Sequence, residues 1–246
     1  MSRVGLQVGI FAFLIACSAS QPERARAPGS ERWGGLSVEE RGRGETVVVL
    51  MHGYGAPGDD LVGLGEELAR SVPARFVMPA APRVWMGGPP GRAWFERDPA
   101  LVGEQLPSAS RAVEGVLSTL ADQGVARDRV VLAGFSQGAM MALERALRGP
   151  EPPRAVVMLS GGLPRGMSES ELDFARLSGV PVFVSHGRED ALLPFSRAEQ
   201  LAARAEEAGA RVTFVPFDGG HSIPAIVRAE LAAFLRDVAA REPSAR

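Results

Sequence analysis

Residues 129–147, which read RVVLAGFSQGAMMALERAL, constrain this chain most, because they predict a buried strand, a sharp turn and a helix in succession. The apolar run VVLA is typical of a strand covered on both faces, and residues 139–147 have the composition of a helix. Ser136 lies at the turn, between Gly134 and Gly138. Two such glycines allow a strained serine whose hydroxyl stands clear of the sheet, as in a turn that carries a nucleophile. The alternative is a serine that only caps the helix.

The chain begins with a segment that has the pattern of an export signal. One early arginine is followed by an apolar run over residues 8–16, which is too short to span a bilayer and predicts a secretory signal peptide over residues 1–16. The run ends in Leu14-Ile-Ala-Cys17, which resembles the site at which bacterial lipoproteins are cleaved and lipidated. Cys17 is the only cysteine, so no internal disulfide can form, and we expect it to carry a lipid anchor. The alternative is an ordinary cleaved signal and a soluble exported protein.

The segment behind this cysteine suggests an anchored domain in the cell envelope. Ser18 resembles the residue found in lipoproteins that are sorted to the outer membrane. Residues 17–31 are small, polar, charged or proline, and predict a flexible tether. Residues 32–240 predict one globular domain, followed by a polar tail over 241–246, since 46% of the chain is apolar and only 23% is charged. A net charge of −2 leaves no basic field for nucleic acid. The sequence indicates no oligomeric state.

Strand-like and helix-like segments alternate through this domain. The predicted strands cover residues 46–51, 75–78, 129–133, 155–159, 182–185 and 212–216. The predicted helices cover residues 60–71, 108–122, 137–147, 195–208 and 224–239. This alternation predicts an α/β fold in one domain, with a mostly parallel sheet, helices on both faces and no large cap domain. Ligand sites in such folds lie beyond the carboxyl ends of the strands.

Three residues that could share one site each follow a predicted strand. These are Ser136, Asp190 and His221. A serine hydroxyl needs a base within hydrogen-bond reach, and the base needs a group that fixes its tautomer. We therefore predict Ser136 as nucleophile, His221 as base and Asp190 as the partner of the base. Glu189 is the competitor for the role of Asp190, and His186 is expected to be structural.

Acyl transfer also needs N–H donors for the oxyanion of its tetrahedral intermediate. One donor is expected from the backbone of Gln137, directly after the predicted nucleophile. The second is expected from Tyr54, in the loop His52-Gly-Tyr-Gly55 that follows the first predicted strand. His52 itself is expected to brace that loop.

Together these motifs resemble the phospholipase/carboxylesterase family of α/β-hydrolases, which includes the acyl-protein thioesterases. The resemblance rests on His52-Gly-Tyr-Gly55, Gly134-Phe-Ser-Gln-Gly138, His186-Gly with Asp190 and Pro194, Gly220-His221, and Gly91-Arg-Ala-Trp-Phe95. The order Ser, Asp, His along the chain is also that of α/β-hydrolases. The resemblance implies a serine hydrolase that cleaves small carboxylic esters or thioesters through an acyl-enzyme, with no cofactor and no metal.

Residues 79–107 form the longest stretch between predicted elements, and they suggest where the acyl chain binds. The stretch is rich in Gly and Pro yet carries Trp85, Met86, Trp94 and Phe95, an apolar load that a solvated loop does not need. We expect Trp85 and Met86, with Trp94, to line an open and shallow groove for short to medium acyl chains. The alternative for Trp94 and Phe95 is that they fill the core of the domain.

Two other functions are compatible with such a fold. One is a peptidase or a relative of the dienelactone hydrolases, although the latter use a cysteine nucleophile and the cysteine here lies at the predicted signal. The other is a binding lipoprotein that keeps the fold without chemistry. The presence of Ser136, Asp190 and His221 argues against a silent protein.

Overall fold

The computed structural model describes residues 32–88, 90–164, 167 and 172–242. The predicted signal peptide, Cys17 and the predicted tether lie outside the described residues, as does most of the predicted tail. No helix within the described ranges combines the length and the apolar composition that a bilayer crossing requires.

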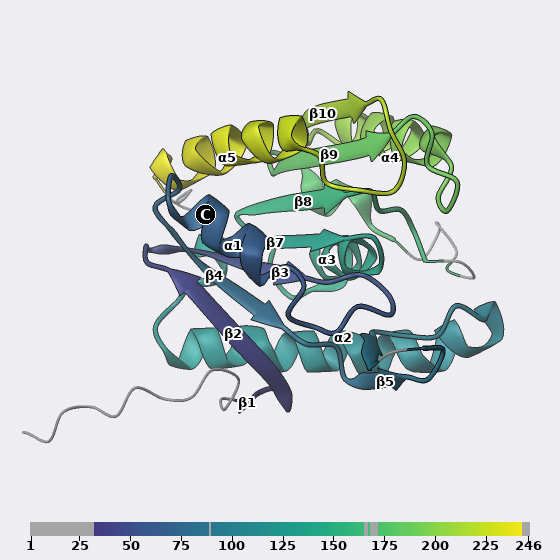
Figure 1. Ribbon diagram of the computed structural model, residues 1–246. Coiled ribbons are helices and arrows are strands. Elements are labelled where there is room, and N and C mark those ends of the chain that lie inside the picture. Colours follow the sequence, from purple (N-terminus) through teal and green to yellow (C-terminus); the bar gives the residue numbers. More distant parts are fainter. Residues whose placement is uncertain (1–31, 89, 165–166, 168–171, 243–246) are drawn as a thin grey trace, which may run out of the picture.

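Within the described residues, eight strands form one central sheet in the order β1-β2-β4-β3-β7-β8-β9-β10 (Figure 1). The strands are β1 (Arg32–Trp33), β2 (Leu36–Gly42), β3 (Thr46–Met51), β4 (Ala74–Pro79), β7 (Val130–Phe135), β8 (Ala155–Leu159), β9 (Pro181–Gly187) and β10 (Arg211–Phe217). Neighbours from β4 across to β10 pair in parallel, whereas β2 pairs antiparallel with β4 and with β1. A separate antiparallel ribbon joins β5 (Arg83–Trp85) to β6 (Gly91–Ala93).

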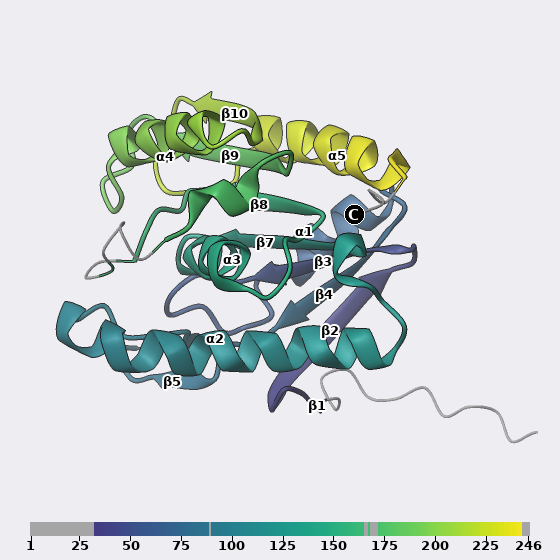
Figure 2. The same ribbon diagram turned by 180° about the vertical axis from the view of Figure 1, so that it is seen from behind.

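Helices cover both faces of the sheet, as Figures 1 and 2 show from opposite sides. The helices α1 (Val62–Ala69) and α5 (Ala225–Ala240) pack on one face. The other face is covered by α2 (Pro99–Asp122), α3 (Gln137–Arg148) and α4 (Phe195–Glu207). The expected α/β fold, a mostly parallel sheet between two helical layers, is therefore confirmed.

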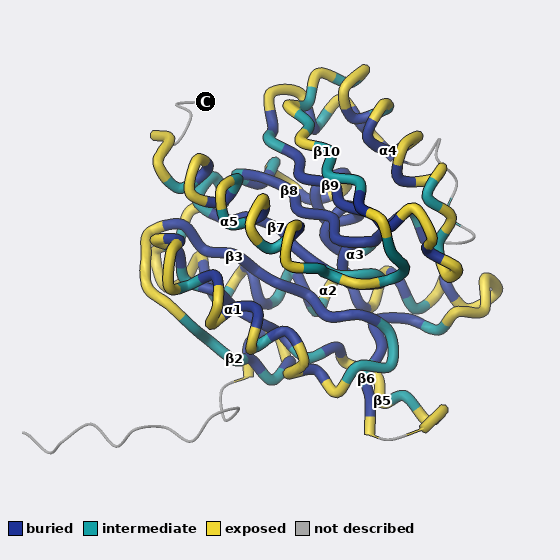
Figure 3. The backbone as a smooth tube through the Cα atoms, turned by 45° about the horizontal axis from the view of Figure 1, so that its top comes forward, coloured by how far each residue is buried: buried dark blue, intermediate teal, exposed yellow. Residues whose placement is uncertain are grey.

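Residues of the central strands alternate between two apolar cores, one on each face of the sheet. Val47, Val49 and Met51 of β3 belong to the core under α2, α3 and α4, and Val48 and Leu50 to the core under α1 and α5. All six residues of β3 are buried, and Figure 3 shows the middle of the sheet as buried, with exposed residues on the outer turns of the helices. Burial on both faces explains why this strand is an unbroken apolar run.

The helix α2 begins at Pro99 rather than at the predicted residue 108, and it continues through Pro107. A proline inside a helix removes one hydrogen bond and is a strong signal for a loop. Burial of Val102 and Leu106 against the core offsets that loss. The side chain of Asp98 caps the helix by accepting a hydrogen bond from the N–H of Ala100 at 3.0 Å. The stretch over residues 79–107 is therefore not one loop but a short ribbon followed by a helix.

The strand β2, next to the short edge strand β1, is a second element that the hydrophobic pattern does not predict. It reads LSVEERG, and its charged residues are only half buried because the strand lies near the edge of the sheet. Ion pairs hold these side chains, including one of 2.6 Å between Arg75 and Glu40 and one of 2.8 Å between Arg41 and Glu66. Backbone pairing with β4, rather than apolar periodicity, defines this strand.

Candidate active site

Ser136 occupies the turn between β7 and α3 in a conformation that side chains rarely adopt, with φ 54° and ψ −116°. The turn is tight because the strand and the helix approach more closely than any side chain allows. A Cβ added to Gly134 would lie 2.2 Å from the carbonyl carbon of Gly138, and a Cβ on Gly138 would lie 2.0 Å from the carbonyl oxygen of Met51. The N–H of Ser136 donates to the carbonyl of Leu159 at 2.8 Å. The turn thus has the strained geometry expected from its two glycines.

The loops after β9 and β10 bring Asp190 and His221 together. Nδ1 of His221 lies 2.7 Å from Oδ2 of Asp190, whose side chain is fully buried. The other oxygen, Oδ1, accepts hydrogen bonds from the N–H groups of Leu192 and Leu193 at 2.8 and 2.9 Å. Burial by itself raises the pKa of the Asp190 carboxyl, but the bonds from Leu193, His221 and Leu192 together outweigh burial and lower the pKa. The carboxylate is therefore held in its charged form beside the imidazole.

His186 and Glu189, the two neighbours of this pair in sequence, occupy different environments. Glu189 is exposed, whereas Asp190 is buried against the imidazole, so the geometry favours Asp190 as the partner of His221. His186 is fully buried, and its Nε2 lies 2.9 Å from the carbonyl of Leu193 and 3.2 Å from Oδ2 of Asp190. A carbonyl only accepts, so Nε2 carries a hydrogen, and His186 braces the Asp190 loop from behind.

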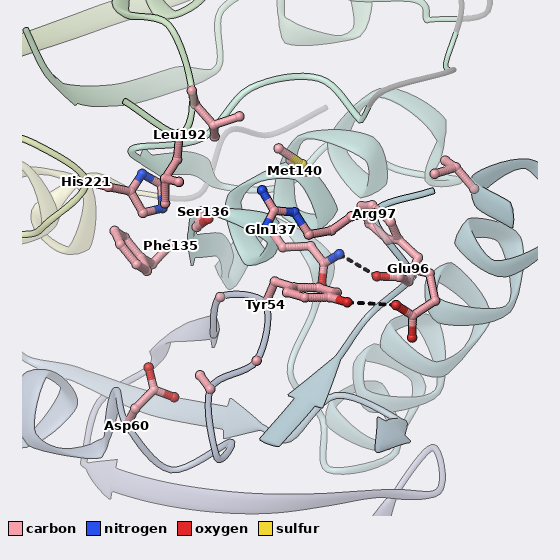
Figure 4. A pocket seen from close by; sticks show the side chains of 16 residues that line it. Tyr54, Asp60, Glu96, Arg97, Phe135, Ser136, Gln137, Met140, Leu192 and His221 are labelled. Atoms are coloured by element: carbon pink, nitrogen blue, oxygen red, sulfur yellow. Dashed lines mark hydrogen bonds between the residues drawn. The ribbon is translucent and has the colours of Figure 1, made fainter. Parts of the chain in front are cut away.

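One pocket contains both Ser136 and His221. The imidazole of His221 packs on the ring of Phe135, with centroids 4.8 Å apart, and Phe135 directly precedes the serine. Figure 4 shows His221 and Ser136 at the same end of the pocket. The rest of the wall is formed by Gly53, Tyr54, Gly55, Ala56, Asp60, Phe95, Glu96, Arg97, Val102, Gln137, Met140, Leu192 and Leu193.

The two residues expected to supply oxyanion donors, Tyr54 and Gln137, both lie on this wall. The loop that carries Tyr54 is fixed by His52, which is buried. Nε2 of His52 accepts a hydrogen bond from the N–H of Ala81 at 2.9 Å, so Nδ1 carries the proton and donates to the carbonyl of Gly53 at 2.8 Å. Burial lowers the pKa of His52, which keeps this bracing tautomer neutral. His52 therefore braces the loop, as expected from the sequence.

The side chain of Gln137 ties the turn at Ser136 to the segment before α2. Its Oε1 accepts from the N–H of Trp94 at 2.9 Å, and its Nε2 donates to the carbonyl of Phe95 at 2.7 Å. The indole of Trp94 in turn donates to the carbonyl of His52 at 3.0 Å. These bonds hold the turn at Ser136, the segment before α2 and the loop after β3 in fixed positions relative to one another. The sequence pattern does not reveal this role of Gln137.

The expected acyl groove on Trp85, Met86 and Trp94 differs from the observed pocket, because none of the three side chains lines it. Trp94 is fully buried beneath the pocket, which corresponds to the core alternative. Met86 is 87% exposed, and Trp85 packs over Gly55 and beside the ring of Tyr54, with ring centroids 6.0 Å apart.

Much of the apolar wall comes instead from residues close in sequence to Ser136 and Asp190. Met140 follows Ser136 by one helical turn, so the spacing on α3 could have indicated it. Leu192 and Leu193 follow Asp190 by two and three residues, in the loop that leaves β9. Phe95, for which the sequence left both the groove and the core open, is a buried core residue that also borders the pocket.

The described residues contain no cluster of three or more His, Cys, Asp or Glu side chains arranged to hold a metal ion. The pocket offers a serine hydroxyl and an imidazole with a charged carboxylate behind it, and the two residues expected to supply oxyanion donors lie on its wall.

Comparison with known proteins places this site in a family. The sequence pattern of the phospholipase/carboxylesterase family matches residues 36–239. Acyl-protein thioesterase 1 of Kluyveromyces lactis is 30% identical over 165 residues, which cover 61% of this chain and 72% of that protein. The crystal structure of esterase PE8 superposes with a TM-score of 0.73 at 33% identity, over 82% of this chain and 99% of its own. The Bacillus cereus carboxylesterase, at 20% identity and a TM-score of 0.70 over 82% of this chain and 94% of its own, shares the fold. The chain therefore belongs to the phospholipase/carboxylesterase family and is a hydrolase of the esterase or thioesterase type.

Proposed function

We propose that this protein cleaves carboxylic esters or thioesters of short to medium acyl chains through an acyl-enzyme on Ser136. The observation that carries this assignment is the hydrogen bond of 2.7 Å between His221 and the buried Asp190, in a pocket that also holds Ser136 on its strained turn. A structural serine needs neither the strain nor an imidazole with a charged partner.

In the first half-reaction, Oγ of Ser136 bonds to the carbonyl carbon of the ester while its proton passes to Nε2 of His221. Asp190 holds Nδ1–H of His221 in place and stabilises the imidazolium. The N–H groups of Tyr54 and Gln137 stabilise the oxyanion. The bond to the leaving oxygen or sulfur then breaks, and the proton on Nε2 moves to that atom.

In the second half-reaction, a water molecule replaces the leaving group. His221 takes a proton from the water as its oxygen bonds to the acyl carbon. The bond to Oγ then breaks, Oγ recovers the proton from Nε2, and a carboxylic acid leaves. The walls formed by Phe95, Met140 and Leu192 would contact the acyl chain, and each buried methylene contributes up to about 0.8 kcal/mol. Leu192 is 52% exposed, so chains beyond medium length would extend into solvent and gain little.

We expect a fluorophosphonate probe to label the native protein at Ser136 and nowhere else, because only an activated serine reacts with it. Peptide mass mapping after labelling locates the adduct, and heat-denatured protein, in which no serine is activated, is the control. Turnover of p-nitrophenyl esters from acetate to laurate gives the chain-length profile. A native protein that neither reacts nor hydrolyses esters would be a binding protein on this fold, and one that reacts but cleaves only peptides would be a peptidase.

We also propose that the protein is exported and anchored by a lipid on Cys17, on the evidence of the segment that ends Leu14-Ile-Ala-Cys17. Changing Cys17 to Ser removes the thiol that would be acylated. We therefore expect the variant to move from the membrane fraction to the soluble fraction with unchanged probe labelling per folded molecule. The change Ser18→Ala is the matched control, and it should stay with the membrane. Equal fractionation of the wild type and the Cys17→Ser variant would refute lipidation.

A further inference from the structure

Arg97 is a cation on the pocket wall that the proposed chemistry does not use. It follows the segment held by Gln137 and lies just before α2. Its guanidinium carbon lies 5.6 Å from the centre of the Tyr54 ring, and Figure 4 shows the group reaching over that ring into the pocket, toward the end where Ser136 lies. A guanidinium stacked on an aromatic ring is held in orientation while its N–H edges remain available to a ligand.

The carboxylates nearest to Arg97 in sequence are occupied by other partners. Oε2 of Glu96 accepts a hydrogen bond from the hydroxyl of Tyr54 at 2.7 Å, and Oε1 of Glu96 lies 4.0 Å from Nε of Arg83. Asp98 caps α2 through the N–H of Ala100. Across the described part of the chain, no carboxylate lies within ion-pair distance of the Arg97 guanidinium. This cation is thus directed into a pocket without a protein anion to neutralise it.

The surroundings of Arg97 favour an anionic ligand group. The pocket wall is mostly apolar, and Phe95, Val102 and Met140 belong to it. The other carboxylate on the wall, Asp60, lies on the far side of the Tyr54 loop in Figure 4. A charge pair formed beside apolar walls is less screened by water than one on an open surface. Arg97 is itself exposed, so the apolar walls reduce the screening of such a pair only on the side that faces the pocket, and the donors of the guanidinium supply the rest of the attraction.

We propose that the pocket selects esters that carry a carboxylate or phosphate a few bonds from the scissile carbonyl, and that Arg97 binds this group. The inference rests on the proposed esterase function and specifies its substrate class. Arginine suits this task because its planar edge can donate two parallel hydrogen bonds to a carboxylate or a phosphate. Arg97 is thus a substrate-binding residue that discriminates charge, while the groups around Ser136 carry out the cleavage.

The test compares pairs of similar substrates in which one member carries an anionic group and the other is neutral. One pair is mono-p-nitrophenyl glutarate against p-nitrophenyl valerate, which places the carboxylate on the acyl side. A second pair is 1-butyrylglycerol 3-phosphate against 1-butyrylglycerol, which places a phosphate on the leaving group. We expect Arg97→Met to lower the ratio of kcat/KM, anionic over neutral, by about 10-fold for at least one pair, the size of one charge-assisted contact. The pair that responds identifies the side and the kind of anion.

Two further variants sharpen the result. Arg97→Glu should reverse the preference, so that the anionic ester becomes the poorer substrate and butyrylcholine, a cationic ester, improves relative to its neutral counterpart. Arg43→Met removes the same charge just before β3, at the amino ends of the parallel strands and therefore away from the pocket. It should leave both ratios unchanged. If the changes at Arg97 and Arg43 alter the ratios equally, the effect arises from the net charge of the protein and the inference is wrong.

Binding separates this inference from the esterase proposal. Glutarate, the product of the first anionic ester, should bind the wild type and bind Arg97→Met about 10-fold more weakly, measured by titration calorimetry without any turnover. A protein that binds glutarate through Arg97 but hydrolyses no ester would refute the esterase and keep the anion site. A protein that hydrolyses neutral esters but shows no response of binding or ratio to Arg97→Met would refute the anion site alone.

Discussion

Replacing Ser136 with glycine is expected to abolish ester turnover and at the same time to make the domain more stable. The loss should be about 10⁴-fold or more in kcat/KM, because the nucleophile and its base act as one unit. The gain arises because Ser136 adopts φ 54° and ψ −116°, where a Cβ is strained by about 1–3 kcal/mol and glycine is not. Glycine also has more conformational freedom in the unfolded chain, and this entropy offsets about 0.5–1 kcal/mol of the gain in stability. A net rise of about 1 kcal/mol, or about 2–4 °C in Tm, should remain.

The matched variant is Ser136→Ala, which removes the hydroxyl but keeps the Cβ. It should be as inactive as Ser136→Gly, and its Tm should stay close to that of the wild type because the backbone strain remains. The difference between the two variants, measured by thermal unfolding, isolates the strain stored at the turn. If the glycine variant is no more stable than the alanine variant, the turn is not strained and the geometry at Ser136 loses its significance. If either variant keeps wild-type turnover, Ser136 is not the nucleophile.

The positions of Ser136, Asp190 and His221 could be predicted because each residue follows a predicted strand. In a parallel sheet, the ends of such strands lie next to one another. A strand buried on both faces is a continuous apolar run, and the residues after such runs meet at one edge of the sheet. The strand ends at β7, β9 and β10 therefore bring the three residues to the same edge although 85 positions separate the first from the last, counting from 136 to 221. The prediction of these three residues therefore requires no knowledge of contacts between distant parts of the chain.

The pocket wall could not be predicted in the same way, because it depends on how loops pack rather than on strand order. Trp94 has the composition of a ligand-binding aromatic, but its indole donates to the carbonyl of His52 and its ring is fully buried. Phe95, the next residue, faces the pocket instead. Both neighbours are buried, but only Phe95 borders the pocket, and the hydrogen bonds of Gln137 to both backbones fix the segment in that orientation. Composition carries no information about that choice.

The start of α2 was missed for a different reason. Pro99 and Pro107 both suggest loop, yet Pro99 is at the first turn, where its missing N–H costs nothing, and Pro107 lies on the exposed face of a helix whose other face is buried. The consequence reaches the site, since this helix supplies Val102 to the pocket and its cap residue Asp98 follows Arg97. The end of the stretch that the sequence predicts as an acyl-binding loop is instead a helix that supports the pocket wall.

Replacing Gly138 with alanine is expected to have the largest effect on stability of any single methyl group near the site. Gly138 is the second residue of α3, and helix propensity alone would make alanine better there by up to about 1 kcal/mol. Packing predicts the opposite sign, because the added Cβ would lie 2.0 Å from the carbonyl oxygen of Met51 and 2.7 Å from that of His52. Both obstacles are backbone atoms, and β3 cannot yield because β4 and β7 flank it in the sheet. The helix must move away from the strand, at a cost of about 3 kcal/mol or more in the free energy of unfolding.

The matched control is Gly103→Ala, which also adds a methyl group inside a helix but meets nothing within 4 Å beyond the nearby backbone of its own helix. It should follow helix propensity and stabilise the domain by up to about 1 kcal/mol in urea denaturation. The two substitutions therefore have opposite expected signs for the same chemical change. Any displacement caused by Gly138→Ala also separates Ser136 from the loop that carries the Tyr54 N–H, so probe labelling should fall even in molecules that remain folded. A Gly138→Ala protein that is as stable and as reactive as the wild type would show that strand and helix do not meet at this turn, and the basis for an activated Ser136 would be lost with it.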